Sequence, residues 1–342
     1  SEGHFARVLR ARDTTDVTPI RADLELESGI AVTGRVVDAS TGKPVSGRVI
    51  YIIAGDNKNL RDYTTLGSRG IHPSTCTMRS DGTFQISTIP GRGWLCIFAS
   101  DRKRYVRERM KNHDGGLLQG IPLGQHPQNF HQVRELNVDE KKPQHLVIKL
   151  RRGVNRELTV MDPRGTPLKG VALFGRSSLP EQGPMKLLAT EKTLLTGLDS
   201  KAPRKIALFH KQRQLGLVAS VTGSDEPLQI RLKPLTSAAG RVVDAKGKAL
   251  ANKIVVMRLS RRFADYRDLP LETLFKLGSE LQQSTRTDAN GRFKMPGLLP
   301  GLKYSLNVYD GAVNRSPIRV AKDSITIKEG RLTRIGALKS RR

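Results

Sequence analysis

Apolar and polar residues alternate in several short stretches of this 342-residue chain, which is the pattern of half-buried β-strands. In Gly29–Gly55 one alternating stretch leads into a turn at Ser40–Gly42, and a second stretch follows. Both stretches are rich in valine and isoleucine, which suit a pleated surface. The pattern predicts a strand, a turn and another strand.

The first strand and turn recur along the chain. GRVVDASTGKP at Gly34–Pro44 is matched by GRVVDAKGKAL at Gly240–Leu250, and a more divergent copy occupies Arg156–Ser177. In every copy the apolar strand ends at an aspartate and a glycine follows. These pairs are Asp38 and Gly42, Asp162 and Gly165, and Asp244 and Gly247. Aspartate accepts hydrogen bonds from turn amides and glycine tolerates positive φ, so we interpret these residues as turn formers.

A second motif follows the first in two of the copies, at Thr77–Ser100 and Thr285–Asp310. Each contains an Asp-Gly or Asn-Gly pair between two apolar stretches, which is a strong hairpin signal, and then a Pro-Gly corner. Aligning the two places Trp94 on Tyr304, so we expect Trp94 to lie in the core of a sandwich. A sugar-stacking platform is the alternative for this tryptophan.

The middle copy lacks this hairpin motif, although alternating strands are still predicted at Lys205–Phe209, Leu215–Val221 and Leu228–Leu232. Between the first two copies, Asp101–Lys142 is polar and basic, and we expect a long excursion there. Apolar residues at helical spacing in Leu269–Leu281 predict a short amphipathic helix.

The predicted fold class is all-β, with three tandem small antiparallel Ig-like or prealbumin-like β-sandwiches and a short helical insertion in the third. The first sandwich spans 29–150, with its basic excursion at 101–142. The second, degenerate sandwich spans 151–234, and the third spans 235–342 with closing strands. We interpret 1–28 as the tail of a preceding domain or an N-terminal strand.

Charge is the strongest compositional feature of the chain. It contains 59 Lys and Arg against 32 Asp and Glu, a formal net charge of +27. Such a field attracts polyanions, including nucleic acid, acidic polysaccharide and anionic lipid. The alternative is a soluble protein whose surroundings tolerate a basic surface. No apolar run approaches the ~18 residues that a membrane helix needs.

The two cysteines, Cys76 and Cys96, are too few for a zinc site. They either form one disulfide, as exported proteins allow, or remain two unpaired buried thiols.

Together the two motifs resemble the carboxypeptidase-regulatory-like repeat, a seven-stranded prealbumin-like β-sandwich that is also grouped with carbohydrate-binding-like folds. The residues that carry the resemblance are Gly34, Asp38, Gly42, Pro44, Asp81, Gly82, Phe84, Gly240, Asp244, Asp288, Gly291, Phe293, Pro300, Gly301 and Tyr304. The resemblance extends to repetitive C-terminal regions of large bacterial envelope proteins of unknown function. It implies export to the periplasm or cell surface, other domains of a larger parent protein as partners, and no catalytic residues.

A search for catalytic signatures found no HExxH, GxSxG, P-loop or GxGxxG motif. We therefore expect no enzyme activity, no cofactor and no metal site. The expected function is a non-catalytic module array that acts as a structural, adhesion or interaction scaffold at the cell envelope. Lys–Asn isopeptide crosslinks, as in related adhesin repeats, would need a lysine on the first strand, where Arg35 and Arg241 stand.

The alternative function is carbohydrate or acidic-polymer binding, with nucleic-acid binding as the third choice because no recognition fold is visible. Guanidinium groups interleaved with an aromatic ring suit sugar stacking and pairing with phosphate or sulfate. The candidate ligand-binding residues are Arg102, Lys103, Arg104, Tyr105, Arg107 and Arg109.

Overall fold

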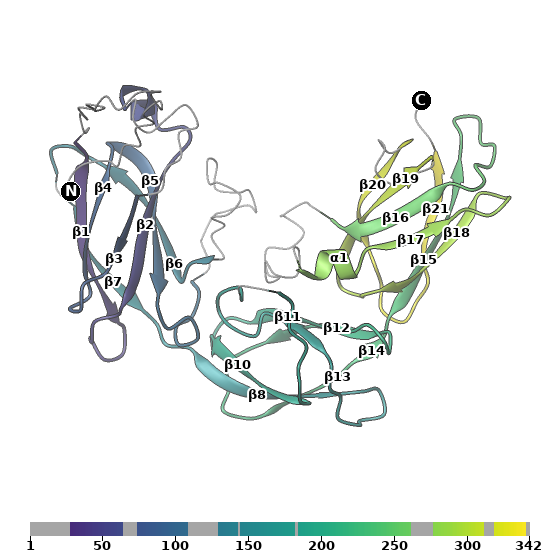
Figure 1. Cartoon of the computed structure of the whole chain (residues 1–342), viewed down its shortest axis with the longest axis horizontal. Coiled ribbons are helices and arrows are strands. Elements are labelled where there is room, and N and C mark those ends of the chain that lie inside the picture. Colours follow the sequence, from purple (N-terminus) through teal and green to yellow (C-terminus); the bar gives the residue numbers. More distant parts are fainter. Residues whose placement is uncertain are drawn as a thin grey trace, which may run out of the picture. The chain divides into compact units, whose positions relative to one another are not determined.

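The structure is a computed structural model that describes residues 28–63, 74–108, 129–142, 144–181, 184–260, 276–310 and 318–339 (Figure 1). The chain divides into two compact units, Ser1–Arg152 and Gly153–Arg342. Each unit has sheets and hydrophobic cores of its own. The described residues contain no helix long and apolar enough to cross a membrane. The predicted tail at 1–28 lies outside them except for its last residue.

The described residues of the first unit form one sandwich of seven strands, which we call the first sandwich. One sheet has the order β4-β1-β7 and the other has the order β3-β2-β5-β6. The strands are β1 (Ile30–Asp38), β2 (Gly47–Ile53), β3 (Ser74–Thr77), β4 (Thr83–Thr88), β5 (Gly91–Ala99), β6 (Gln132–Val138) and β7 (Gln144–Leu150). A short 3-10 helix, η1 (Lys58–Asp62), follows β2. The alternating inward residues of both sheets form the core, with Val36, Val49 and Ile97 fully buried.

The second unit contains two more sandwiches. In the middle sandwich the sheets have the orders β10-β8-β13 and β14-β12-β11-β9, and in the third sandwich β18-β15-β21 and β17-β16-β19-β20. The middle strands are β8 (Val154–Met161), β9 (Ala172–Phe174), β10 (Lys192–Leu198), β11 (Arg204–His210), β12 (Leu215–Val221), β13 (Leu228–Arg231) and β14 (Lys233–Pro234). The third-sandwich elements are β15 (Thr236–Val243), β16 (Ile254–Leu259), α1 (Gly278–Glu280), β17 (Gln283–Arg286), β18 (Arg292–Leu298), β19 (Lys303–Tyr309), β20 (Ile318–Thr326) and β21 (Thr333–Lys339).

The all-β prediction is confirmed, and so are the three strands expected in the middle copy. The predicted tandem β-sandwiches are mainly antiparallel, with one parallel pair in each. The first strand of each sandwich pairs in parallel with a late strand, as β1 does with β7, β8 with β13, and β15 with β21. A parallel neighbour requires a crossover between sheets, which the Greek-key-like order of each sandwich supplies.

The first and third sandwiches share one strand order, whereas the described residues of the middle one (153–181 and 184–234) contain no strand equivalent to β3 and β17. In the first sandwich the Asp81-Gly82 turn joins β3 in one sheet to β4 in the other, so the expected hairpin is a turn between two sheets. A module without this edge strand does not need that turn, in keeping with the absence of the second motif from the middle copy. At the other edge of its larger sheet, β14 pairs with β12.

The repeated opening glycine makes room for the repeated phenylalanine. Gly34 lies opposite Phe84 across β1 and β4, and Gly240 lies opposite Phe293 across β15 and β18. A Cβ atom at Gly34 would lie 2.7 Å from Cζ of Phe84, and one at Gly240 would lie 2.8 Å from Cζ of Phe293. The glycine and the phenylalanine of the two motifs, far apart in sequence, thus contact each other across neighbouring strands.

The repeated aspartates form turns, as predicted. Oδ1 of Asp38 accepts the amides of Ser40 and Thr41, and Oδ1 of Asp162 and of Asp244 each accept two amides of the following turn. The glycines that follow all have positive φ: Gly42 at 68°, Gly165 at 87° and Gly247 at 86°.

The expectation that Trp94 lies in the sandwich core is wrong, because the alignment behind it is off by one residue. The register puts Gly93 opposite Ile53, in the place that Tyr304 takes opposite Leu259. A Cβ atom at Gly93 would lie 2.3 Å from the Tyr51 hydroxyl, so the Tyr51 ring fills the space of the missing side chain. Trp94 therefore lies on the opposite, outer face of its sheet, in a small cluster with Ile52, Cys96 and Phe130.

Two further expectations are refined by the structure. The excursion expected at 101–142 contains β6, which forms an edge of the larger sheet beside β5. Of the helix expected at Leu269–Leu281, residues 269–275 lie outside the described residues, and α1 covers only Gly278–Glu280. The flanking Leu277 and Leu281 are fully buried in the core of the third sandwich, as an amphipathic segment requires.

The middle and third sandwiches share a hydrophobic core. On β11, Ile206 and Leu208 face the core of the middle sandwich, whereas Ala207 and Phe209 belong to the cluster that fills the third. A Cβ atom at Gly216, which pairs with Phe209, would lie 2.5 Å from Cδ1 of Leu299. Both sandwiches therefore bury apolar side chains in the same cluster.

Polar contacts border this shared core. Nζ of Lys211 lies 2.7 Å from Oε2 of Glu280, Lys233 pairs with Glu329, and Nζ of Lys276 donates to the carbonyl of Glu181 at 2.6 Å. Only Leu235 separates β14 from β15, so the connection is itself part of the sheets. The two sandwiches form one packed body.

Candidate ligand-binding surface

The predicted basic segment forms a turn directly after β5. The Asp101 carboxylate accepts the amide of Lys103 at 3.2 Å, and its carbonyl accepts the amide of Arg104 at 3.4 Å. Lys103 and Arg104 are exposed, and Arg102 and Arg107 are half-buried. Arg109 lies outside the described residues. The turn thus presents the exposed Lys103 and Arg104, together with the half-buried Arg102, at one end of the first sandwich.

Tyr105 does not offer its ring to a ligand, which corrects the expectation of an exposed aromatic between the guanidinium groups. Its side chain is only 5% exposed, and its hydroxyl donates to Oδ2 of Asp38 at 3.3 Å. Burial, followed by the negative charge of Asp38, raises the pKa of Tyr105. Tyr105 therefore fastens the basic turn to the end of β1.

Asp38 joins the first repeat turn to the end of the sandwich. Besides the turn amides it accepts the Ser40 hydroxyl at 2.6 Å and Nε of Arg152 at 2.5 Å. Burial alone would raise the pKa of Asp38, but the hydrogen bonds from Ser40 and Arg152 and from the turn amides outweigh it and hold that pKa well below its usual range. A carboxylate with this many donors is a structural anchor.

Aromatic rings pack behind the basic turn. The Arg102 guanidinium lies 5.0 Å from the centroid of the Phe98 ring, within the range of a cation–π contact. His131 lies between Phe98 and Tyr105, with ring centroids 6.2 Å and 6.1 Å away. Lys103 and Arg104 are consequently held on a rigid base, and their side chains are what the turn can offer to an anion.

His131 is buried and neutral in the folded protein. Its Nδ1 accepts the amide of Ala99 at 3.1 Å, which assigns the proton to Nε2. Burial lowers the pKa of His131 to about 4. The His131 carbonyl also accepts the amide of Glu108 at 2.7 Å, so this residue ties the basic segment to the sheet edge.

Trp94, the alternative sugar platform, is fully buried and has no free ring face. The Arg92 guanidinium lies 5.2 Å from its ring centroid. Arg92 in turn pairs with Asp56 at 2.9 Å and with Glu135 at 2.5 Å, so its charge is already neutralised. Stacking of a sugar on Trp94 would require these contacts to open.

The two thiols lie on opposite faces of one sheet. Cys76 on β3 pairs with Val49 and faces the sandwich core, whereas Cys96 on β5 pairs with Ile50 and belongs to the outer cluster with Trp94. Both cysteines are free, and the alternative of a disulfide is excluded because β2 lies between them. Among the described residues no group of three His, Cys, Asp or Glu side chains could hold a metal ion.

Several of these residues carried no signal in the sequence. Arg152 contacts Asp38, and His131 contacts Glu108 of the basic segment, each from more than twenty residues away in the chain. Neither Arg152 nor His131 belongs to a repeated motif. Alternation within β15, β18 and β21 could have shown that basic residues gather on one face of that sheet, because outward positions follow directly from the strand period.

Comparison with known proteins gives similarity only at the level of solved structures. No family model matches the sequence, and no curated protein matches it. Similar solved structures include the Bacillus anthracis TIE protein, at 13% identity and a TM-score of 0.24 over 92% of this chain. This chain spans 52% of the length of the TIE protein.

Two pilins are also similar. A streptococcal ancillary pilin matches at 12% identity and a TM-score of 0.25, covering 92% of this chain and 99% of its own. The minor pilin GBS52 of Streptococcus agalactiae matches at 12% identity and a TM-score of 0.33, covering 60% of this chain and 96% of its own. At these TM-scores the chains do not superpose as wholes.

Proposed function

We propose that this chain is a non-catalytic array of β-sandwich modules that serves as a structural, adhesion or interaction scaffold at the bacterial cell envelope. The observation that carries the proposal is the hydrophobic core shared by the middle and third sandwiches. An interface that buries Phe209 of one sandwich in the core of the next resists bending, whereas modules joined by a free linker reorient readily. Stiffness between modules is a property that a scaffold uses and a catalyst does not need.

The use of the titratable groups supports the same proposal. The carboxylates of Asp38, Asp162 and Asp244 accept hydrogen bonds from turn amides. His131 is buried behind the basic turn. An active site instead leaves an acid, base or nucleophile able to reach a substrate. The repeated residues of this chain build turns and cross-strand contacts.

The proposal is tested by locating the chain in the bacterium that encodes it. An antiserum against the purified chain is used on fractionated cells and on intact cells treated with a protease. We expect the signal in the envelope fraction and its loss on protease treatment of intact cells, while a cytoplasmic control protein survives. Recovery of the chain in the cytoplasmic fraction would contradict the envelope role. Crosslinking of intact cells, followed by capture with the same serum, would identify the neighbours of the scaffold.

The second candidate function is binding of an acidic polymer at the turn after β5. The exposure of Lys103 and Arg104 on a rigid base favours it. The double variant K103Q/R104Q removes both cations. It keeps the buried Tyr105 and its hydrogen bond to Asp38, but loses the Arg104 guanidinium that lies 5.9 Å from the centroid of the Tyr105 ring. A drop in heparin affinity beyond that of K43Q/K141Q, two exposed lysines in other turns of the same sandwich, would support the site. Equal losses in the two variants would assign the binding to net charge alone.

A further inference from the structure

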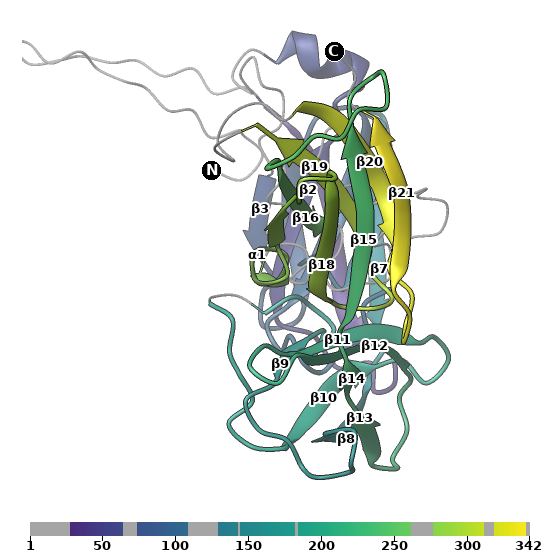
Figure 2. The same ribbon diagram turned by 90° about the vertical axis from the view of Figure 1, so that its right-hand side faces the viewer.

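The outer face of the smaller sheet of the third sandwich carries only positive charge. This sheet, β18-β15-β21, has β15 in its centre (Figure 2). Its exposed basic side chains, which we call the basic face, are Arg241, Arg292, Lys294, Arg334 and Lys339. The other outward positions of the three strands are small or uncharged, and no residue of the basic face forms a salt bridge with any carboxylate that the structure describes.

These charges are adjacent across the strands. Arg241 lies directly opposite Arg292, and Ala239, two residues before Arg241, lies between Lys294 and Arg334. Like charges that face each other across a sheet destabilise it. Only the Nε of Arg241 has a partner in the described structure, the carbonyl of Asn290 at 2.9 Å. The basic face therefore keeps most of its hydrogen-bond donors available for an anion.

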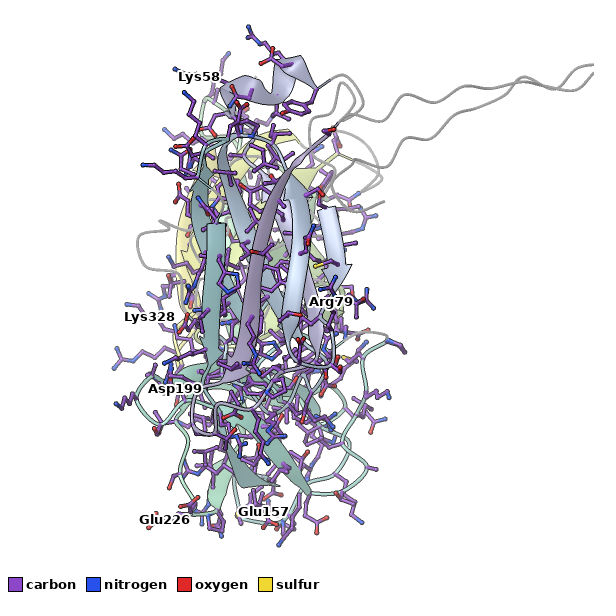
Figure 3. All side chains as sticks on the ribbon, turned by 90° about the vertical axis from the view of Figure 1, so that its left-hand side faces the viewer. Lys58, Arg79, Glu157, Asp199, Glu226 and Lys328 are labelled. Carbon is purple, nitrogen blue, oxygen red and sulfur yellow. The ribbon has the colours of Figure 1, made fainter. Side chains whose placement is uncertain are left out.

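The first sandwich shows that the fold does not require these charges. Figure 3 looks onto its corresponding sheet, β4-β1-β7. By the two registers, Thr83 and Gln85 stand where the third sandwich has Arg292 and Lys294, and His145 stands where it has Arg334. Arg35 corresponds to Arg241 and donates in the same way, to the carbonyl of Asp81 at 2.8 Å. Three of the five cations are thus particular to the third sandwich.

The dimensions of the basic face suit a linear polymer. Outward positions on one strand are about 6.6 Å apart and neighbouring strands about 4.8 Å apart, so the five charges occupy an area about 10 Å wide and 13 Å long. The surface is an open sheet without an aromatic side chain at its outward positions. Single-stranded nucleic acid is bound largely through stacking on such aromatics, so their absence from this face favours a ligand that offers charge alone.

We propose that the basic face binds an acidic polysaccharide, a sugar chain that carries a carboxylate or sulfate on each repeating unit. The three arginines can pair with carboxylates in a bidentate manner, and Lys294 and Lys339 add point charges at the ends of the face. This site is separate from the turn after β5, and it does not depend on the scaffold role or on cellular location.

The test measures binding of fluorescently labelled polygalacturonate to the full chain in ~0.1 M salt, with duplex DNA of similar length as the competing polyanion. The variant R292T/K294Q introduces the residues that occupy these positions in the first sandwich, so the sheet is expected to fold as before. K43Q/K141Q removes the same charge from exposed turns elsewhere. Thermal unfolding of both variants verifies that they are folded.

We expect R292T/K294Q to weaken polygalacturonate binding about tenfold, and to reduce the slope of log Kd against log salt concentration by about 1.4, which corresponds to two lost contacts. K43Q/K141Q should change Kd by less than about twofold. Equal losses in both variants, or no loss in either, would overturn the proposal. The proposal would also be overturned if duplex DNA bound as tightly as polygalacturonate and R292T/K294Q lost that DNA binding. This result would identify a nucleic-acid surface.

Discussion

In the first sandwich, Nε of Arg152 lies 2.5 Å from Oδ2 of Asp38, a carboxylate that is only 2% exposed. The pair joins the end of β1 to the second residue after β7, the strand next to β1 in the sheet but more than a hundred positions away in the chain. Asp244, at the same place in the third sandwich, has the turn amides but no ion pair among the described contacts. Within the described part of the chain, which ends at residue 339, the same repeated residue thus has two structural settings.

Asp38→Asn should therefore destabilise its sandwich more than Asp244→Asn does. Asparagine can still accept the turn amides but loses the charged partner, so we expect a loss of about 2 kcal/mol for D38N and below about 1 kcal/mol for D244N. Urea unfolding followed by Trp94, the only tryptophan, reports on the first unit, and calorimetry reports on the second. Equal costs would contradict a stabilising role of the Arg152 pair.

Asp38 also predicts a loss of stability in acid. Its pKa in the folded chain lies below the ordinary value of 3.8, so the unfolded chain takes up this proton first as the pH falls. The stabilisation is complete above about pH 4 and is lost below it. The D38N variant should show a flatter decline of unfolding free energy between about pH 4 and pH 2, measured by Trp94 fluorescence in urea. A decline as steep as in the unmodified chain would contradict this assignment.

The contact between Gly240 and Phe293 predicts a mutational rescue. Gly240→Ala places a methyl group 2.8 Å from Cζ of Phe293, and the overpacking should lower stability by about 2 kcal/mol. Phe293→Leu shortens the opposing side chain, so G240A/F293L should be more stable than the sum of the single changes predicts. Ala239→Val, at the preceding position of β15 and facing outward, is the control. Strict additivity, measured by calorimetry, would disprove the contact.

The sequence was sufficient for the features that short-range rules determine. Strand alternation, the aspartate turns at Asp38, Asp162 and Asp244, and the positive φ of the glycines after them each depend on a few neighbouring residues. These local features fix where the strands begin and end. They explain why the fold class could be predicted from one sequence.

The features that the sequence did not predict depend on contacts between distant segments. Trp94 lies on the outer face of its sheet, and not in the core, because the Tyr51 side chain from another strand fills the space above Gly93. The burial of Tyr105 depends on Asp38, and the neutral His131 depends on the amide of Ala99. No local pattern in a single sequence reports such pairs, so the candidate site was located only as a basic segment.

The cysteines should remain unpaired and differ in reactivity. Burial raises the pKa of both thiols, and Cys96 is fully buried whereas Cys76 is partly exposed. Native protein treated with iodoacetamide should label slowly at Cys76 and only after unfolding at Cys96. Peptide mass spectrometry measures this order, with urea-unfolded protein as the control for full labelling. An intramolecular Cys76–Cys96 disulfide, formed under mild oxidation without loss of the native fold, would contradict the strand arrangement.

The shared core predicts that the middle and third sandwiches unfold together. Phe209→Ala removes a side chain of the middle sandwich that is buried in the cluster of the third, at a cost of about 3–5 kcal/mol. The calorimetric transition of the second unit should shift as a whole by roughly 10 °C, since each kcal/mol corresponds to about 2–4 °C at this size. The Trp94 transition of the first unit should not change. Splitting of the second unit into two transitions would show that the modules are independent.

His131 predicts a second pH dependence, at higher pH than that of Asp38. Its pKa is about 4 in the folded chain against an ordinary 6.5, so below pH 6.5 the unfolded chain binds a proton that the folded chain excludes. Stability should therefore fall as the pH drops from about 6.5 to about 4, by about 3 kcal/mol in total.

His131→Asn tests this assignment because the Asn oxygen can accept the Ala99 amide as Nδ1 does and carries no titrating group. Urea unfolding followed by Trp94 fluorescence at pH 7, pH 6 and pH 5 should show a smaller decline for H131N than for the unmodified chain. His145→Asn, on the exposed side of β7, is the matched control and should keep the full decline. A decline of the same size in H131N would mean that His131 is not the group whose protonation opposes folding in this pH range.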